Sequence, residues 1–102
     1  MTAYLQTVRS RALPGRDDEY RDWYVSTHIP EMLELEGFVS AELHRLVAID
    51  DEPNGFLCIY RIETADLKAT QAAMVAAGAT MTPSEAMDVP ATQVDVYESA
   101  AA

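Results

Sequence analysis

Hydrophobic and polar residues alternate in four stretches of the chain, as they do in half-buried β-strands. These stretches cover residues 3–9, 38–49, 56–62 and 91–97. Two further stretches, 17–36 and 67–77, repeat their hydrophobic residues every three to four positions, which is typical of amphipathic helices. The pattern therefore predicts the element order β-α-β-β-α-β.

Turn and capping residues set the limits of the first helix. Pro14 and Gly15 break the chain after the first strand. Asp17 and Asp18 follow, and acidic side chains favour the first turn of a helix because they meet the positive end of its dipole. Gly37 is placed to end the helix, since glycine readily adopts the left-handed conformation common at helix C-termini.

Similar signals divide the second half of the chain. Residues 50–55, DDEPNG, form a predicted turn, so the strands on either side of it are expected to pair as a hairpin. Thr64 or Asp66 can cap the second helix, and Gly78 follows its end. Residues 83–87 are predicted to form a short helical turn.

This element order predicts an α+β, ferredoxin-like fold in which four antiparallel strands carry two helices on one face. Residues 1–98 are expected to form a single domain, and 99–102 a flexible tail. Both alternating sets of strand side chains include hydrophobic residues, such as Leu57 and Ile59 on the face opposite Cys58. Because a large open hydrophobic face is unfavourable in water, we expect a homodimer whose two sheets stack face to face.

The composition narrows the range of partners and compartments. The net charge of the 102-residue chain is −10, which disfavours nucleic acid and anionic membrane surfaces. The sequence contains no signal-peptide pattern and no hydrophobic run long enough to span a membrane, so we expect a cytoplasmic protein. The single cysteine, Cys58, lies in the hydrophobic run FLCIY and is expected to be buried.

His28 is the first candidate for chemistry. Within the first helix Tyr20, Tyr24 and His28 recur every four residues and should lie along one side. Pro30 has no N–H and crowds the preceding turn, so the helix is expected to kink or end there. His28 then either hydrogen-bonds the backbone freed by the proline or reaches the cavity beneath the helix as a general acid or base.

His44, the second histidine, shares one face of its strand with Ser40, Glu42 and Leu46. If this face lies under the helices, His28 and His44 meet across one pocket and Glu42 orients the second ring. If it is the opposite face, His44 lies at the dimer interface. The sequence leaves both arrangements open.

The middle of the chain resembles the dimeric α/β-barrel superfamily, in particular its small EthD-like and RedY-like members. The resemblance rests on Trp23-Tyr24, His28-Ile29-Pro30 and Gly37-Phe38. Relatives include polyketide cyclases, cofactor-free monooxygenases, dehydratases and lactone isomerases. The resemblance implies a pocket between helices and sheet in which a histidine handles protons.

On this basis His28, Tyr24 and His44 are the predicted catalytic residues. The predicted substrate-binding residues are Tyr4, Gln6, Trp23, Thr27, Glu42 and Tyr60. The expected substrate is a small aromatic, pyrrole, indole or polyketide-like metabolite that is neutral or weakly acidic.

The sequence predicts neither a metal site nor a cofactor. The two histidines and one cysteine do not have metal-ligand spacing, and no glycine-rich phosphate loop is present. The expected chemistry is therefore cofactor-free cyclisation, dehydration, isomerisation or oxygenation. The alternatives are a non-catalytic binding or carrier protein and a structural dimer with a vestigial pocket. A cavity with histidines and a tyrosine favours the enzyme, and a uniformly hydrophobic cavity favours the carrier.

Overall fold

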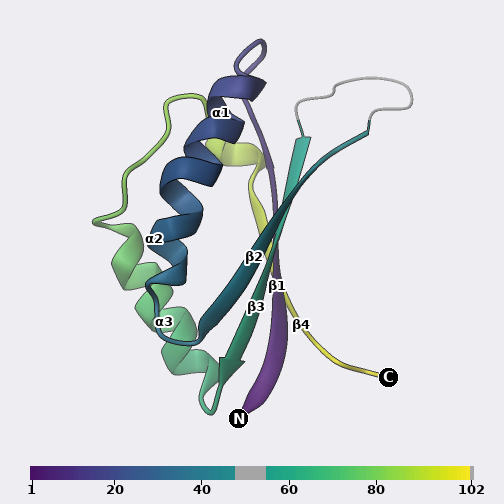
Figure 1. Cartoon of the computed structure of the whole chain (residues 1–102), viewed down its shortest axis with the longest axis vertical. Helices are drawn as coiled ribbons and strands as arrows, with labels where there is room; N and C mark the ends of the chain where they lie inside the picture. Colours follow the sequence, from purple (N-terminus) through teal and green to yellow (C-terminus); the bar gives the residue numbers. More distant parts are fainter. Residues whose placement is uncertain (48–54, 102) are drawn as a thin grey trace.

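The chain folds into a four-stranded antiparallel sheet with its helices on one face (Figure 1). The computed structural model describes residues 1–47 and 55–101. The elements are β1 (Thr2–Arg11), α1 (Asp17–Trp23), η1 (Tyr24–His28), α2 (Ile29–Leu33), β2 (Phe38–Arg45), β3 (Gly55–Thr64), α3 (Leu67–Gly78), η2 (Val89–Ala91) and β4 (Gln93–Glu98). The strand order is β2-β3-β1-β4, which confirms the predicted ferredoxin-like fold.

The alternation of side chains gives the two faces of the sheet different roles. On β1 and β3 the even-numbered residues lie toward the helices, and Gln6 and Tyr60, which are paired across the strands, are both almost fully buried. The odd-numbered residues lie on the open face, where Leu5 is 45% exposed. The helix-covered face therefore contains the core.

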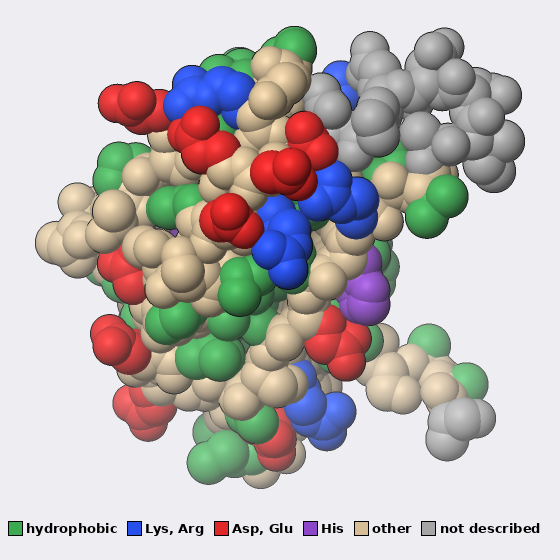
Figure 2. Space-filling view, turned by 45° about the horizontal axis from the view of Figure 1, so that its top comes forward, with side chains coloured by type: hydrophobic (Ala, Val, Ile, Leu, Met, Phe, Trp, Pro, Cys, Tyr) green, Lys and Arg blue, Asp and Glu red, His purple; other side chains and the backbone are tan. Residues whose placement is uncertain are grey.

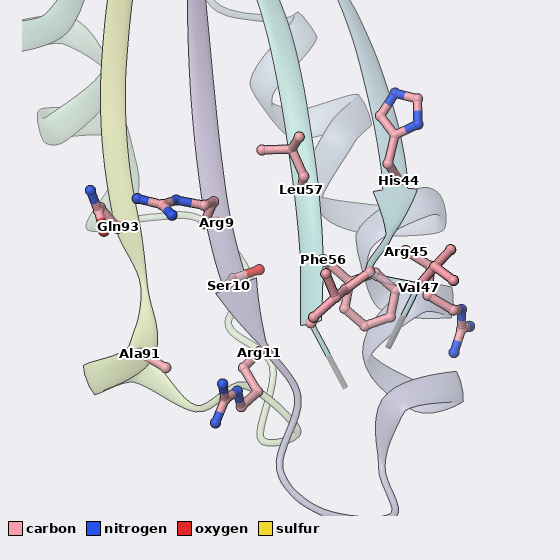
Figure 3. Close-up of a pocket in the computed structure, with 12 residues that line it drawn as sticks. Arg9, Ser10, Arg11, His44, Arg45, Val47, Phe56, Leu57, Ala91 and Gln93 are labelled. Carbon is pink, nitrogen blue, oxygen red and sulfur yellow. The ribbon is translucent and has the colours of Figure 1, made fainter. Parts of the chain in front are cut away.

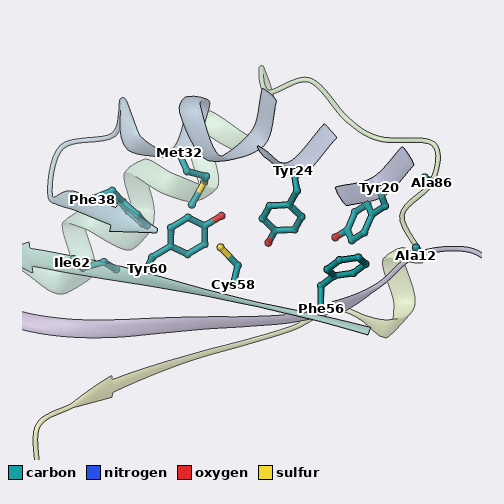
Figure 4. Packing of buried hydrophobic residues seen from close by; sticks show 10 residues of the cluster. All are labelled: Ala12, Tyr20, Tyr24, Met32, Phe38, Phe56, Cys58, Tyr60, Ile62 and Ala86. Atoms are coloured by element: carbon teal, nitrogen blue, oxygen red, sulfur yellow. The ribbon is translucent and has the colours of Figure 1, made fainter. Parts of the chain in front are cut away.

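Aromatic rings fill the core between the first helix and the sheet (Figure 4). Tyr20 packs edge-on against Phe56, with ring centroids 5.5 Å apart, and its hydroxyl donates a hydrogen bond of 2.8 Å to Ser10 Oγ. Tyr24 and Tyr60 direct their hydroxyls toward Cys58, which is buried as expected. The tyrosine hydroxyls of the core thus lie between the helices and the sheet.

The first helix passes through Pro30, so the expected alternative of an end there is wrong, and the expected kink stays a prediction. Residues 24–28 form a π-helical segment in which the N–H of Ile29 donates to the carbonyl of Tyr24, five residues earlier. A widened turn is compatible with proline, because Pro30 has no N–H for the regular bond and its ring needs room in the preceding turn. The helix continues to Leu33.

Gly37 occupies a position that only glycine fits without strain. Its φ is 94°, and a Cβ there would lie 3.3 Å from the carbonyl oxygen of Glu63. The N–H of Glu63 in turn donates 2.9 Å to the Gly37 carbonyl. Gly37 lies beyond the last helical turn and joins the helix to β2.

The predicted cap of α3 and the predicted strand pairing hold, whereas strand limits change. Asp66 caps α3, accepting a hydrogen bond of 3.1 Å from the N–H of Ala69. The hairpin of β2 and β3 forms, but β2 ends at Arg45, before the predicted end at residue 49. The predicted turn at 50–55 lies outside the described residues except for Gly55, and β4 begins at Gln93 and not at residue 91.

The short helix predicted at 83–87 is wrong. Backbone groups of this segment pair with the end of β1, since the N–H of Leu13 donates 2.7 Å to the Ala86 carbonyl and Met87 bridges to Ala12. These bonds satisfy the backbone without a helical turn. The following segment is a single 3₁₀ turn, η2.

The surface and the chain end complete the description. Acidic and basic side chains are interspersed with hydrophobic ones over the face shown in Figure 2. Within the described ranges, no helix is both long and hydrophobic enough to cross a membrane. The last strand ends at Glu98, and the division into a domain of residues 1–98 and a tail of 99–102 stays a prediction.

Candidate functional site

A cavity of about 220 Å³, partly open to solvent, lies between the helix layer and the sheet. Its wall comes from β1, β3, β4, the first helix, α3 and the connection between α3 and β4. Four methionines contribute to it: Met32, Met74, Met81 and Met87. Polar side chains in the wall include Gln6, His28, Tyr60 and Thr92. Most of the remaining wall is aromatic or aliphatic, and none of the described residues that line it is Lys, Arg, Asp or Glu.

His28 reaches this cavity because the helix widens just before Pro30. In a regular α-helix, residues five apart lie about 140° from each other around the axis. In the π-helical turn, His28 instead stacks on Trp23, with ring centroids 4.8 Å apart and planes at 16°. Tyr24 meets the imidazole edge-on at 5.1 Å. Two aromatic neighbours thus fix the orientation of the imidazole.

The environment of His28 favours its neutral form. Burial lowers the pKa of the imidazole below its usual value, and the nearby carboxylate of Glu31 opposes this only in part. The Nδ1 atom is buried and has no hydrogen-bond partner among the described residues. Within that same part of the chain, His28 forms no hydrogen bond to the helix backbone, so the structure does not support a capping role.

Gln6 and Tyr60 form the floor of one part of the cavity. The Gln6 side-chain N–H donates to Met74 Sδ at 3.2 Å, while Gln6 Oε1 is buried without a partner in the described part of the chain. Burial raises the pKa of the Tyr60 hydroxyl and of the Tyr24 hydroxyl beside it. Both phenols therefore stay protonated and can donate hydrogen bonds.

Unpaired polar atoms concentrate around this one cavity. Four buried side-chain atoms have no partner within the described ranges: Gln6 Oε1, His28 Nδ1, Tyr60 Oη and Thr92 Oγ1. All four belong to side chains that line the cavity. Since leaving a buried polar group unpaired costs about 1–3 kcal/mol, their convergence indicates that a bound molecule supplies the missing partners.

The connection at residues 79–88, here called the strap, is tied to the first helix beside the cavity. The indole N–H of Trp23 donates 3.1 Å to the carbonyl of Thr82. The N–H of Thr82 donates to the carboxylate of Glu31, at 3.2 Å to Oε2. Met81 and Met87 line the cavity from the strap. Trp23 therefore contacts both His28 and the strap.

The structure gathers five of the nine predicted site residues around the cavity and places four elsewhere. The five are Gln6, Trp23, Tyr24, His28 and Tyr60. Tyr4 packs at the edge of the core beside the ends of the chain, and Thr27 lies 3.4 Å from the Ser26 hydroxyl on the outer part of the helix. His44 and Glu42 lie on the open face of the sheet.

His44 therefore does not share a pocket with His28, which corrects the predicted catalytic pair and the substrate-binding place of Glu42. The reason is a β-bulge between Phe38 and Ser40, which adds one residue and shifts the alternation of β2. After the bulge Ala41 and Leu43 face the helices. His44 is 53% exposed, and its Nε2 lies 3.3 Å from Glu42 Oε2.

Other cavity residues were not predicted. Tyr20, Met32, Met74, Met81, Met87 and Thr92 line the cavity and are not among the nine predicted site residues. Met87 belongs to the connection before β4, where no hydrophobic period places a side chain, whereas Thr92 falls at the start of the predicted strand 91–97 but was not singled out there. Only the fold brings them to the cavity.

A second, wider hollow of about 550 Å³ lies on the open face (Figure 3). Arg9, Leu57, His44 and Gln93 extend across its four strands. Its edge includes Arg45, which pairs with Asp17 Oδ2 at 2.8 Å. Among the residues that the structure describes, none lines both this hollow and the helix–sheet cavity.

Fold and site together define a ferredoxin-like α+β protein with a hydrophobic cavity, one histidine and several unpaired polar groups. The sequence matches no family model and no curated relative. A candidate antibiotic biosynthesis monooxygenase from Bordetella bronchiseptica superposes with a TM-score of 0.72 at 16% identity, covering 99% of this chain and 100% of that one.

Two further solved structures are similar over nearly the whole chain. SnoaB, a cofactor-independent oxygenase from Streptomyces nogalater, has a TM-score of 0.63 at 14% identity, with 100% of this chain and 97% of that chain covered. An EthD family protein from Bacillus halodurans has a TM-score of 0.63 at 15% identity, with 94% and 98% covered. The resemblance to EthD-like proteins is thus confirmed at the level of the fold, and that to RedY-like proteins stays a prediction.

Proposed function

We propose that the protein is a cofactor-independent enzyme that moves a proton on a small molecule held in the helix–sheet cavity. His28 is the group that takes and returns the proton. The observation that carries this proposal is the set of four unpaired polar atoms, including His28 Nδ1, on side chains around one hydrophobic cavity. The fold it shares with SnoaB, described as a cofactor-independent oxygenase, is consistent with this proposal.

The proposed step needs only groups of this chain. A ring nitrogen of neutral His28 removes a proton from a carbon next to a carbonyl, and the electron pair of the C–H bond moves to the carbonyl oxygen. The Tyr60 hydroxyl, kept protonated by burial, donates a hydrogen bond to the enolate formed. The imidazolium then returns a proton. Cyclisation, dehydration, isomerisation and cofactor-free oxygenation can all begin with this step.

The proposal is tested by hydrogen–deuterium exchange into 2-tetralone, a neutral two-ring ketone with acidic α-protons. Proton NMR in D₂O follows the loss of the α-proton signals with the intact protein. We expect His28→Asn to slow the catalysed exchange about 10²–10⁴-fold, the usual contribution of a general base. His44→Asn is the matched control and should exchange as the wild type does. Equal rates in wild type and His28→Asn, or no catalysis by the wild type, overturn the proposal.

A binding or carrier protein is the second candidate. The methionines in the cavity wall favour it, because flexible thioether side chains adapt to ligands of different shape. A carrier would bind 2-tetralone without accelerating the exchange. The same NMR sample distinguishes the two functions, since binding shifts the resonances of Trp23 whether or not exchange occurs.

We also propose that a second copy of the chain covers the open face of the sheet. Leu5 and its neighbour on β4, Tyr97, are 45% and 55% exposed, and Ile59 lies on the same face. Such a hydrophobic face favours burial against a partner. The face also carries both Arg61 and Glu42, so the same surface on a second copy has a carboxylate available for each arginine. We also propose a cytoplasmic location, for which the support is the sequence pattern alone.

A further inference from the structure

We propose that the molecule bound in the helix–sheet cavity is a neutral aromatic of one or two fused rings with a hydrogen-bonding oxygen at each end. This inference rests on the proposed function, since it concerns the same cavity, but it is tested by binding alone. It assigns Thr92 as a residue that determines specificity. The size of the cavity limits the number of rings, the lack of charged side chains selects a neutral ligand, and the unpaired polar groups define its oxygens.

The size of the cavity limits the number of rings. An engineered hydrophobic cavity of about 150 Å³ accommodates benzene. The cavity here is larger, about 220 Å³. Two fused rings therefore fit, whereas a linear system of three rings would extend beyond this volume, either into solvent or against wall residues such as Met74 or Met81. Van der Waals contact with a planar ring is available from Trp23 and Tyr24.

The charge of the cavity selects a neutral molecule. The titratable side chains that line it within the described ranges are Tyr20, Tyr24, His28 and Tyr60, and no arginine or lysine is among them. Burial lowers the pKa of His28, so the imidazole supplies no positive charge at neutral pH. A carboxylate or phosphate would lose its hydration without finding a counter-charge, in a protein whose net charge is already −10.

Two of the unpaired polar atoms, Gln6 Oε1 and Thr92 Oγ1, belong to side chains at different levels of the sheet. Gln6 is paired with Tyr60 across β1 and β3, so their side chains share one level of the sheet. Thr92 directly precedes Gln93, whose partner on β1 is Arg9, and therefore lies level with residue 10. Four residues of strand separate the two levels, or about 13 Å at 3.3 Å per residue.

This backbone separation sets the length scale for a bifunctional ligand. Two fused rings with an oxygen at each end, and a hydrogen bond of about 2.8 Å beyond each oxygen, span a comparable length. Gln6 Oε1 only accepts, whereas the protonated Tyr60 hydroxyl at the same level can donate, so a phenolic or enolic hydroxyl, which does both, suits that end. The Thr92 hydroxyl can donate or accept, so a hydroxyl or a carbonyl suits the other end.

The probes are 2,6-dihydroxynaphthalene, 2-naphthol, 2-naphthoate and 2-hydroxyanthracene. Titration of the intact protein is followed by the indole N–H resonance of Trp23, the single tryptophan of the chain, in ¹H–¹⁵N NMR. We expect the diol to bind about fivefold to tenfold more tightly than 2-naphthol, the gain of one further hydrogen bond. The naphthoate and the three-ring phenol should each bind at least about tenfold more weakly than 2-naphthol.

Thr92→Val isolates the second polar end, because valine keeps the shape of threonine without the hydroxyl. The variant should bind 2-naphthol as the wild type does and lose the preference for the diol. Thr7→Val, on the open face, is the matched control and should keep that preference. Equal binding of diol and 2-naphthol by the wild type, or a preference that survives in Thr92→Val, overturns the bifunctional ligand. If 2-naphthoate binds most tightly, the inference that the ligand is neutral is wrong. If 2-hydroxyanthracene binds most tightly, the limit of two rings is wrong.

The outcomes separate this inference from the proposed function. A Thr92-dependent preference for the diol without exchange of 2-tetralone supports the ligand class and rejects the enzyme. His28-dependent exchange without that preference supports the enzyme and rejects the ligand class.

Discussion

The two histidines of this protein lie on opposite faces of one sheet, and their surroundings differ in every respect that matters for chemistry. His28 stacks between aromatic rings beside a hydrophobic cavity, and its Nδ1 has no partner among the described residues. His44 is half-exposed and lies beside the carboxylate of Glu42. The difference shows that residue type alone does not mark a site: burial, fixed orientation and an unpaired atom do.

The same contrast extends to the faces that carry the histidines. The helix-covered face encloses a cavity without charged side chains in the described chain, whereas the open face mixes hydrophobic residues with arginines and carboxylates. The first arrangement suits a small neutral molecule, and the second suits a large surface of matching composition. The variants below are chosen to affect one face and leave the other unchanged.

The largest effect is expected from Ile59→Asp, which places a carboxylate in the middle of the open face. Burying an unpaired charge against a second copy is strongly unfavourable, so the dimer should dissociate, with an association constant at least about 100-fold lower. Light scattering after size-exclusion chromatography measures the mass. Val75→Asp, at an exposed position of α3, is the matched control and should stay dimeric. A monomeric wild type contradicts the proposed interface.

The sequence predicts the fold well because the fold depends on regular periods. The strands, both helices and the Asp66 cap follow from alternation, helical spacing and capping chemistry. The fold alone then places Gln6, Trp23 and Tyr60 near one cavity. These residues could be identified before the structure because they lie within regular elements.

The wrong placement of His44 has a local physical cause, the insertion of a single residue at the start of β2. The bulge at the start of β2 moves His44 to the open face, and the π-helical turn brings His28 onto Trp23. Neither changes the composition or the hydrophobic pattern enough to be read from one sequence. Thr92 was missed for a different reason, since alternation within the predicted strand 91–97 does not by itself mark a small polar side chain as part of a cavity.

The next largest effect is expected from Trp23→Phe. Phenylalanine keeps an aromatic ring beside His28 but cannot donate to the Thr82 carbonyl, so the strap loses one of its two ties to the helix. We expect the free energy of unfolding to fall by about 1–2 kcal/mol, the loss of a hydrogen bond and of some buried ring area. Urea denaturation measures the change. Amide exchange at Thr82 should accelerate by more than the global change in stability explains, and equal acceleration throughout the chain argues against a local tie.

A smaller effect of opposite sign is expected from Tyr60→Phe. The Tyr60 hydroxyl is buried without a partner in the described part of the chain, so its removal should raise the free energy of unfolding by up to about 1 kcal/mol. The same change should weaken binding of 2-naphthol. Tyr97→Phe, on the open face, is the control and should change stability by less than about 0.5 kcal/mol. If Tyr60→Phe instead destabilises the protein, the hydroxyl has a partner and the cavity loses one of its unpaired groups.

The smallest effect concerns the pH dependence of stability, which separates a buried neutral histidine from an exposed one. Burial lowers the pKa of folded His28, whereas in the unfolded chain the value is about 6.5. Below pH 6.5 the unfolded state therefore binds more protons at this residue than the folded state. Its contribution to stability is present above that pH and is lost as the pH falls toward the lower folded value. Urea denaturation at pH 7.5 and 5.5 should show a larger loss of stability for the wild type than for His28→Gln, which has no proton to bind. Equal losses would mean that the imidazole is as hydrated in the folded chain as in the unfolded one, and the comparison between the two faces would then no longer support His28 as a buried base.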